Sequence, residues 1–182
     1  IMGIALAVMT LIVVISVMNG FEEDIKEKLL GTQSHHVVAS YTDGLADPEA
    51  VAGKIMQDPE VVGATPFILS EGLLSTAGGV KGVVIRGIEP ASATRVIRLK
   101  EVMTAGSYDG LGSGGILMGS ELAAKNGLSI GDTATLIAPS GTITPLGLIP
   151  RSMPFTVKGF FSTGMYEYDS TMVYISLDAA KR

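Results

Sequence analysis

The stretch "GILMGSELAAKNGLSIGDTATLIAP", residues 115–139, contains two apolar runs with a helix-forming segment between them. The first run predicts a short strand over 115–119. Ser120 is a good N-cap for the segment "ELAAKNG", and Gly127 suits the left-handed turn that ends a helix. The second run, 130–139, alternates as a strand does. This strand–helix–strand order indicates a mixed α+β domain.

The rest of the chain supplies further strands and helices of the same domain. Strands are expected at 34–40, 58–78, 80–90, 154–164 and 170–176, with a hairpin turn at Gly78-Gly79. Asp47 as N-cap and Pro48 at the first helical position predict a helix that follows them. The loop-rich segment 91–113 allows one short helix near 93–96, and a last helix follows Ser176. The mixed strands and helices predict a sheet with helices packed on it.

The N-terminal stretch "IMGIALAVMTLIVVISVM", residues 1–18, carries no charge. As a helix it spans roughly 27 Å, close to the hydrocarbon thickness of a bilayer. The run is long for a signal peptide and lacks a small-residue cleavage site, so a membrane helix is the better interpretation. The helical spacing of Phe21, Ile25 and Leu29 continues it as a stalk to about Gly31. We therefore expect a membrane part (1–19), a stalk (20–34) and a core domain (35–182).

The ends of the chain also carry predictions. The acidic flank "FEEDIKEK" suits the non-cytoplasmic side of a membrane. The chain begins at Ile1, and its final helix is cut short at Arg182, so we expect a fragment of a longer protein.

Composition and motifs exclude several kinds of function. A net charge of -5 without a basic run argues against nucleic-acid binding, and the absence of cysteine removes thiolate metal sites. The string "GLGSGG", 110–115, precedes a strand rather than a helix, so it is expected to be a loop and not a dinucleotide site. His35 and His36 should point to opposite faces of a strand. "GMYEYDS", 164–170, is expected to be a polar turn, and no catalytic or metal-binding set of residues is predicted.

A proline-punctuated stretch, "APSGTITPLGLIPRSMPF" (138–155), lies between two predicted strands and should form a projecting hairpin. Its apolar residues Leu146, Leu148 and Ile149 would either form a tip offered to a partner or fold back onto the domain's own core. Pro145 and Pro150 restrict the backbone, which lowers the entropy lost on docking. Both interpretations remain open at this point.

Three stretches carry a resemblance to a known family. "VVISVMNGFEEDIKEKLLG" (13–31) resembles the first membrane helix and stalk of the LolC/LolE permeases of the bacterial lipoprotein-releasing (Lol) ABC transporter. The segment 115–139 and "FTVKGFFSTGMYEYDSTMVYISLDAA" (155–180) resemble its MacB-like periplasmic core domain. The resemblance implies an α+β fold, with a mixed sheet and packed helices, on a transmembrane and stalk helix.

The resemblance also implies a function. In this family a separate LolD-like ATPase binds ATP and Mg, so this chain would need no cofactor, and its second permease subunit would be LolE-like or another copy. The permease releases outer-membrane lipoproteins from the inner membrane, which it crosses several times, and passes them to the periplasmic carrier LolA. The periplasmic part would be 20–182.

Site residues follow from the resemblance alone. "TPLGLIP" (144–150) resembles the carrier-holding Hook, with Leu146 entering the carrier's apolar cavity. The implied carrier-binding residues are Pro139, Thr144, Pro145, Leu146, Gly147, Leu148, Ile149, Pro150 and Arg151. The implied lipoprotein path along the stalk is Val17, Met18, Phe21 and Ile25. Thr135 and Met153 stand where the family is expected to have arginines.

Two other functions are compatible with these patterns. One is a MacB-type efflux or other mechanotransmission permease that acts with a periplasmic adaptor. The other is a membrane-anchored enzyme, which would need an acid–base or nucleophile set that the sequence does not show.

Overall fold

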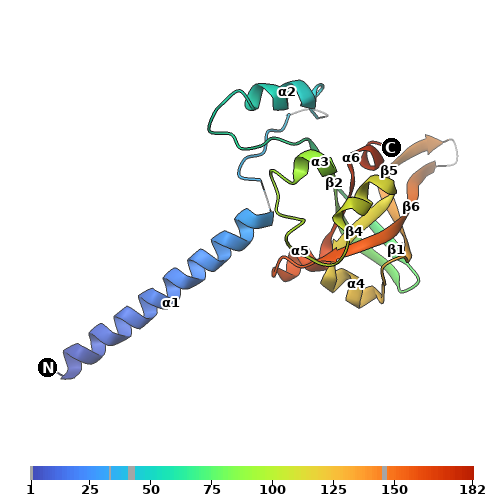
Figure 1. The fold of residues 1–182 in the computed structure, drawn as a ribbon. Coiled ribbons are helices and arrows are strands. Elements are labelled where there is room, and N and C mark those ends of the chain that lie inside the picture. Colours follow the sequence, from blue (N-terminus) through green and yellow to red (C-terminus); the bar gives the residue numbers. More distant parts are fainter. Residues whose placement is uncertain (1, 33, 41–43, 145–146) are drawn as a thin grey trace.

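The computed structural model describes residues 2–32, 34–40, 44–144 and 147–182. Its most extended element is helix α1 (Met2–Thr32), which extends away from the remaining domain (Figure 1). The most apolar 18-residue window within Met2–Asp24 has a mean hydropathy of 2.4 and none of it is buried, so this part of the helix is long and apolar enough to cross a membrane. The helix is continuous, as its spacing predicted. The boundary between a membrane part and a stalk remains a prediction.

The segment after α1 contains one wrong prediction and one correct one. Residues 34–40 are not a strand: in the described part of the chain they join no ladder, and Val37 and Val38 are exposed. A short apolar run alone does not form a strand, because a strand needs a partner for its backbone groups. Helix α2 (Pro48–Ile55) forms as predicted, and the Asp47 carboxylate accepts the backbone N–H of Ala50 at 2.9 Å.

The predicted hairpin is present. Strands β1 (Phe67–Thr76) and β2 (Gly79–Ile88) pair antiparallel along their whole length, from Phe67 opposite Ile88 to Thr76 opposite Gly79. Gly79 has φ +121°, a conformation that favours glycine at the turn. The first strand begins only at Phe67 rather than at residue 58.

The segment 90–113, expected to be rich in loops, contains short elements of secondary structure. Helix α3 (Pro90–Ala93) begins three residues before the predicted position, and strand β3 (Met103–Gly106) and a 3-10 helix (Tyr108–Ser113) follow. "GLGSGG" therefore lies in this 3-10 turn and leads into strand β4 (Gly115–Gly119), which is not the geometry of a dinucleotide site.

Strand β4 leads directly into the helix predicted after it. Helix α4 (Ser120–Asn126) ends at Gly127 with φ 62°, as predicted, but its N-cap is Gly119 and not Ser120, which is the first helical residue. Gly119 occupies the cap because the backbone of Asp169 packs directly against it, leaving no room for a side chain.

The remaining elements complete the sheet. They are β5 (Thr133–Thr144), β6 (Gly147–Phe161), α5 (Tyr166–Thr171), β7 (Met172–Ser176) and α6 (Leu177–Ala180). "GMYEYDS", expected to be a turn, instead contains the helix α5.

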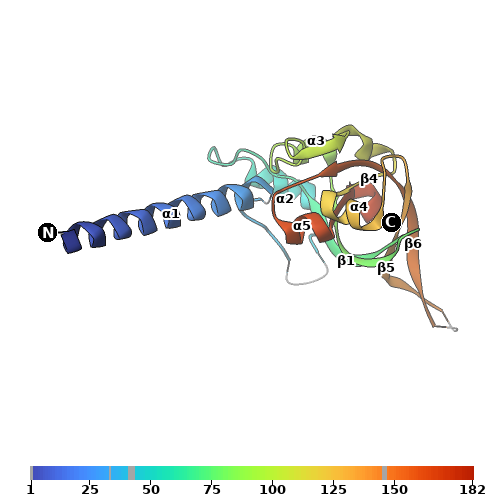
Figure 2. The same ribbon diagram turned by 90° about the horizontal axis from the view of Figure 1, so that it is seen from below.

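The seven strands form one mixed sheet in the order β3-β6-β4-β7-β2-β1-β5. Pairs β2–β7 and β4–β6 are parallel and the other pairs are antiparallel. Strand β5 also pairs with β6, so the sheet curls and closes on itself (Figure 2). Strand β6 makes this possible because its first part pairs with β5 and its last part lies between β4 and β3.

Two apolar cores lie on the two faces of this sheet. The enclosed core includes Leu74, Ile116, Met118, Val157 and Val173, and helices α4 and α6 contribute to it. The outer core contains Leu117, Phe161 and Tyr174 and is covered by the segment 90–113. Burial on both faces supplies the main stabilisation of the domain.

Candidate functional site: the projecting hairpin and the long helix

The ends of β5 and β6 that are joined to each other extend beyond the rest of the sheet as a two-stranded ribbon (Figures 1 and 2). Within the domain the ribbon is paired from Thr133 opposite Thr156 to Ala138 opposite Arg151. Beyond the domain the pairing resumes from Thr142 opposite Ile149 to Thr144 opposite Gly147. This hairpin projects from the closed sheet (Figure 1).

A break in the ladder separates the base of the hairpin from its outer part. Between the two paired stretches, the three residues 139–141 of β5 lie opposite a single residue of β6, Pro150. Pro139 and Pro150 have no backbone N–H and cannot donate to a ladder, which accounts for the irregularity. A bulge of this kind changes the direction of a ribbon locally.

The structure brings the backbone of most predicted hairpin residues together at one end of the molecule. Gly147, Leu148 and Ile149 pair with Thr144, Ile143 and Thr142 respectively. Pro145 and Leu146, predicted to form the apolar tip, lie outside the described residues. Their role in binding a carrier remains a prediction.

Arg151 lies at the base of the hairpin and is exposed. Its guanidinium donates a hydrogen bond to the backbone carbonyl of Arg182. At the two positions where the family resemblance led us to expect arginines, the chain has uncharged residues, Thr135 and Met153. Thr135 is half-buried, and Met153 packs against the enclosed core, so neither offers a charge to a partner.

The predicted stalk residues lie far from the hairpin. Val17, Met18 and Phe21 have exposed side chains on α1, at 65%, 62% and 62% of their full accessibility. Their spacing places them on one side of the helix. The side chain of Ile25 lies outside the described ones. The structure therefore does not bring the stalk set and the hairpin set together, because α1 and the hairpin tip extend from opposite sides of the core domain (Figure 1).

Sequence reasoning missed a buried carboxylate in the segment 162–169. Asp169 is only 3% exposed, and it accepts hydrogen bonds from the hydroxyl of Ser162 at 2.9 Å and from the backbone N–H and hydroxyl of Thr163 at 2.8 and 2.9 Å. The N–H of Gly164 donates to it at 3.3 Å. This network fixes the β6–α5 turn, so Asp169 has a structural role. The Ser-Thr-Gly sequence ahead of an Asp was the only local signal for it.

Two buried tyrosines have perturbed ionisation. Burial, with the nearby Asp109 carboxylate, raises the pKa of Tyr108 to about 12, and its hydroxyl donates to the carbonyl of Pro90 at 2.9 Å. Burial also raises the pKa of Tyr174, although the Arg86 guanidinium beside it acts in the opposite direction. Neither hydroxyl is paired with a base, so both are structural.

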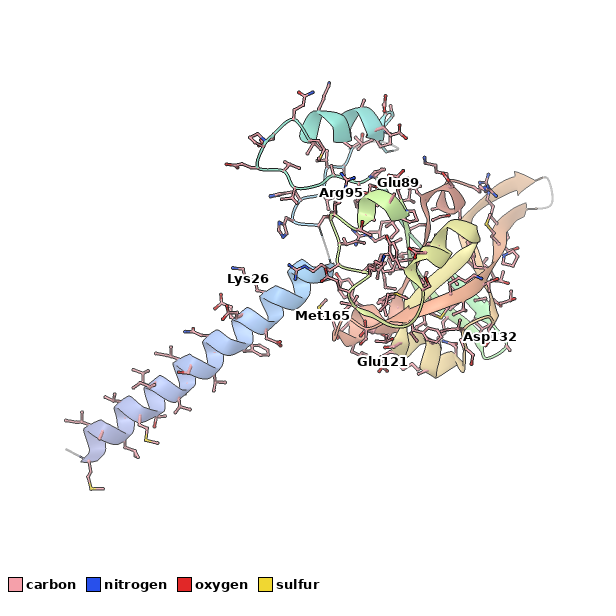
Figure 3. The ribbon with its side chains drawn as sticks, viewed as in Figure 1. Lys26, Glu89, Arg95, Glu121, Asp132 and Met165 are labelled. Carbon is pink, nitrogen blue, oxygen red and sulfur yellow. The ribbon has the colours of Figure 1, made fainter. Side chains whose placement is uncertain are left out.

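The described residues contain no group of three or more His, Cys, Asp or Glu side chains that could hold a metal ion. His35 and His36 are both exposed, outside the sheet. Figure 3 shows that the labelled charged residues, among them Glu89, Glu121 and Asp132, are spread over different parts of the domain. The prominent features are therefore a hairpin that projects from a closed sheet and a helix long enough to enter a membrane.

These features define a domain built around a closed sheet and a projecting hairpin, preceded by a helix long and apolar enough to cross a membrane. The chain belongs to the family of the MacB-like periplasmic core domain, whose sequence model matches residues 1–182. Its relatives include the lipoprotein-releasing system transmembrane protein LolC of Neisseria meningitidis serogroup B, 35% identical over 98% of this chain and 44% of that protein. LolC of Xylella fastidiosa is 36% identical over 98% of this chain and 43% of that protein. The chain thus spans less than half the length of these relatives.

A more distant relative and a protein of similar fold are also found. The lipoprotein-releasing system transmembrane protein LolE of Haemophilus influenzae is 26% identical over 74% of this chain and 34% of that protein. The crystal structure of the extracellular domain of YknZ, a noncanonic ABC-type transporter from Gram-positive bacteria, superposes with a TM-score of 0.51 and 13% identity. It covers 74% of this chain and 64% of that domain. This last likeness shows the fold alone.

Proposed function

We propose that this chain is part of a permease subunit of an ABC transporter that releases lipoproteins from the inner membrane and passes them to the soluble carrier LolA. The observation that carries the proposal is its similarity to proteins named LolC, at 35–36% identity over 98% of the chain. That similarity includes the membrane-length helix as well as the core domain. The full-length protein would be a multi-pass inner-membrane protein with residues 20–182 in the periplasm.

The hairpin is the proposed carrier-binding element. A ribbon paired on both sides of its bulge is ordered before it meets a partner, which reduces the entropy lost on docking. The sequence of its outer part, "TPLGLIP", is rich in apolar residues. An apolar tip suits a carrier whose pocket accepts lipid acyl chains, because both surfaces then leave water.

The chain itself is proposed to perform no chemistry. ATP and Mg would bind to a separate LolD-like subunit, and a LolE-like subunit or a second copy of this chain would complete the permease. The helix α1 provides a physical connection, since its 31 residues extend about 46 Å without a break. Val17, Met18, Phe21 and Ile25 would line the path by which the lipoprotein leaves the membrane.

A site-specific photo-crosslinker tests this proposal. It is placed at Leu146 of the full-length permease, in membranes that contain the ATPase and the carrier. A control places the probe at Val62, which is 84% exposed on the core domain but outside the sheet. We expect a crosslink to the carrier from residue 146 only, and its loss when the neighbouring apolar residues are changed in the Leu148→Glu/Ile149→Glu variant. Labelling of the chain's own core alone from residue 146 would contradict the carrier assignment.

A MacB-type efflux or other mechanotransmission permease is the second candidate. It is favoured by the family match itself, which is to a MacB-like domain. In that case the same crosslinker would capture a periplasmic adaptor protein and not a lipoprotein carrier.

A further inference from the structure

Three cations lie close together in the sequence after the start of α3. Residues 91–100, "ASATRVIRLK", contain Arg95, Arg98 and Lys100 and no acidic residue, in a chain whose net charge is -5. All three side chains are exposed. These three residues are here called the cationic segment. A local excess of positive charge on an acidic protein indicates a surface for an anionic partner.

The cationic segment is held on the outer core in a fixed orientation. Ile97 and Leu99 are each 3% exposed and belong to that core. Arg98 and Lys100 alternate with them and are exposed, so both point away from the core. Arg98 Nε lies 4.0 Å from the Glu101 carboxylate, but the two side chains are 64% and 71% exposed, so water weakens this ion pair. The positive charge of the segment is therefore available to a partner.

The segment lies on the side of the core domain from which α1 extends. In Figures 1 and 2 the chain between α3 and β3, which contains the segment, lies beside the C-terminal end of α1. The membrane-length part of α1 ends at Asp24, and the helix itself ends at Thr32. Residues 25–32 rise about 12 Å along the helix axis. The core domain therefore begins about 12 Å from the apolar interior of the bilayer that α1 would enter.

This distance brings the cationic segment within electrostatic reach of lipid headgroups. The headgroup layer of each leaflet adds about 5–8 Å to the hydrocarbon core. About 4–7 Å then remain between the headgroups and the end of α1. Charges interact over about 8 Å at physiological ionic strength. Cations beside the end of the helix are therefore close enough to be attracted by anionic phospholipid.

A second feature of the same side suits a bilayer surface. Helix α5 also lies beside the end of α1, and Met165, which precedes α5, is seen on this side of the domain in Figure 3. Tyr166, the first residue of α5, is 54% exposed, and the Lys125 ammonium lies 4.5 Å from the centre of its ring. Tyrosine is enriched at the membrane–water interface, because its ring is apolar and its hydroxyl is polar. Cationic and aromatic side chains thus occur together on the side that faces the membrane.

We propose that the cationic segment and Tyr166 form a surface that lies against anionic phospholipid headgroups of the bilayer that α1 enters. This inference goes beyond the proposed function, because it needs only that α1 enters the membrane and requires neither a carrier nor a lipoprotein. Glu22 and Glu23, at the membrane end of the stalk, are repelled by the same headgroups, and the cations of the domain offset that repulsion. Contact through both the helix and this surface fixes the tilt of the core domain over the membrane.

Amide hydrogen exchange of the full-length permease complex in lipid nanodiscs tests this surface. Nanodiscs of phosphatidylcholine alone are compared with nanodiscs that also contain phosphatidylglycerol, which is anionic. Each cation near an anionic surface favours the docked state by about fivefold. We therefore expect the backbone amides of residues 94–102 to exchange at least about fivefold more slowly in the anionic nanodiscs. The amides of residues 151–153, at the hairpin base, should exchange at the same rate in both.

Three variants make the test specific. Arg98→Gln/Lys100→Gln should remove the slowing of exchange. The matched control Lys54→Gln/Lys81→Gln removes two exposed cations of α2 and β2 and should retain the slowing. Arg98→Lys/Lys100→Arg keeps both charges and should retain it as well. Slow exchange in the buried strand β4 shows that each variant is folded.

Two outcomes would overturn the inference. If residues 94–102 exchange equally in both kinds of nanodisc and Arg98→Gln/Lys100→Gln changes nothing, the cationic segment does not contact the membrane. If that variant speeds exchange by the same factor in neutral and in anionic nanodiscs, the cations bind an acidic protein surface, such as the stalk of a neighbouring subunit, and not lipid. Because the experiment contains no carrier, neither result affects the carrier-binding assignment of the hairpin.

Discussion

Replacing Asp169 by alanine should strongly destabilise the core domain. The carboxylate accepts four hydrogen bonds, at 2.9, 2.8, 2.9 and 3.3 Å, and is 3% exposed. A buried donor left without an acceptor costs about 1–3 kcal/mol. The backbone N–H of Thr163 cannot turn away, whereas the two hydroxyls can rotate to other acceptors. We therefore expect Asp169→Ala to lower the free energy of unfolding by about 3–5 kcal/mol.

Two further variants make this prediction specific. Asp169→Asn keeps one acceptor oxygen, but its amide NH₂ group would face hydrogen-bond donors that now point at the carboxylate. We therefore expect it to lower the free energy of unfolding by about 1–2 kcal/mol. Glu167→Ala, an exposed change in the same helix, should stay within about 0.5 kcal/mol. Urea unfolding of the detergent-solubilised chain can be followed by tyrosine fluorescence, since the chain has five tyrosines and no tryptophan. A loss below about 1 kcal/mol for Asp169→Ala would show that this network does not hold the β6–α5 turn.

Three more predictions concern single residues. Gly106 has φ +83°, and a side chain there would meet the backbone carbonyl of Lys158. Gly106→Ala should therefore lower the free energy of unfolding, measured in urea, by more than about 2 kcal/mol. The control Gly112→Ala places its methyl group in open space and should leave that free energy nearly unchanged. Because the pKa of Tyr108 is raised from 10.0 to about 12, the unfolded chain loses its proton first. The stabilising contribution of the Tyr108 hydroxyl should therefore be complete below pH 10 and be lost between pH 10 and 12. In unfolding measured as a function of pH, Tyr108→Phe should show a smaller loss of stability over that range. Asp47→Ala should lower the helicity of α2 at a cost of about 1 kcal/mol, measured by amide hydrogen exchange, and unchanged exchange would contradict the capping role.

Elements with strong local signals could be predicted from the sequence. The cap at Asp47, the glycine stop at Gly127 and the hairpin between β1 and β2 depend on neighbouring residues, and all three are present in the structure. Helix α1 is continuous because its apolar and charged stretches share one helical spacing. Local chemistry alone was sufficient for these elements.

Features that depend on distant residues were not predictable. The strand expected at 34–40 fails because no described segment pairs with it, and pairing is a property of the whole fold. The closure of the sheet requires β5 to pair with both β1 and β6, and periodicity does not reveal this. The burial of Asp169 and Arg86 likewise depends on which segments cover them.

The candidate site was only partly accessible to sequence reasoning. The prolines and flanking strands indicated a hairpin, and the structure has one at that position. The exposure of Leu69 and Leu73 on β1 was not predicted, because the alternation of these residues is that of an ordinary half-buried strand.

The length of β6 has a mechanical consequence. This one strand runs from the hairpin tip, past β5, to its place between β4 and β3, and it ends shortly before α5. A pull on the tip along the strand would load the many ladder hydrogen bonds inside the domain together, in shear, rather than peeling them apart one at a time. A tethered load at the hairpin would thus be carried by the whole sheet.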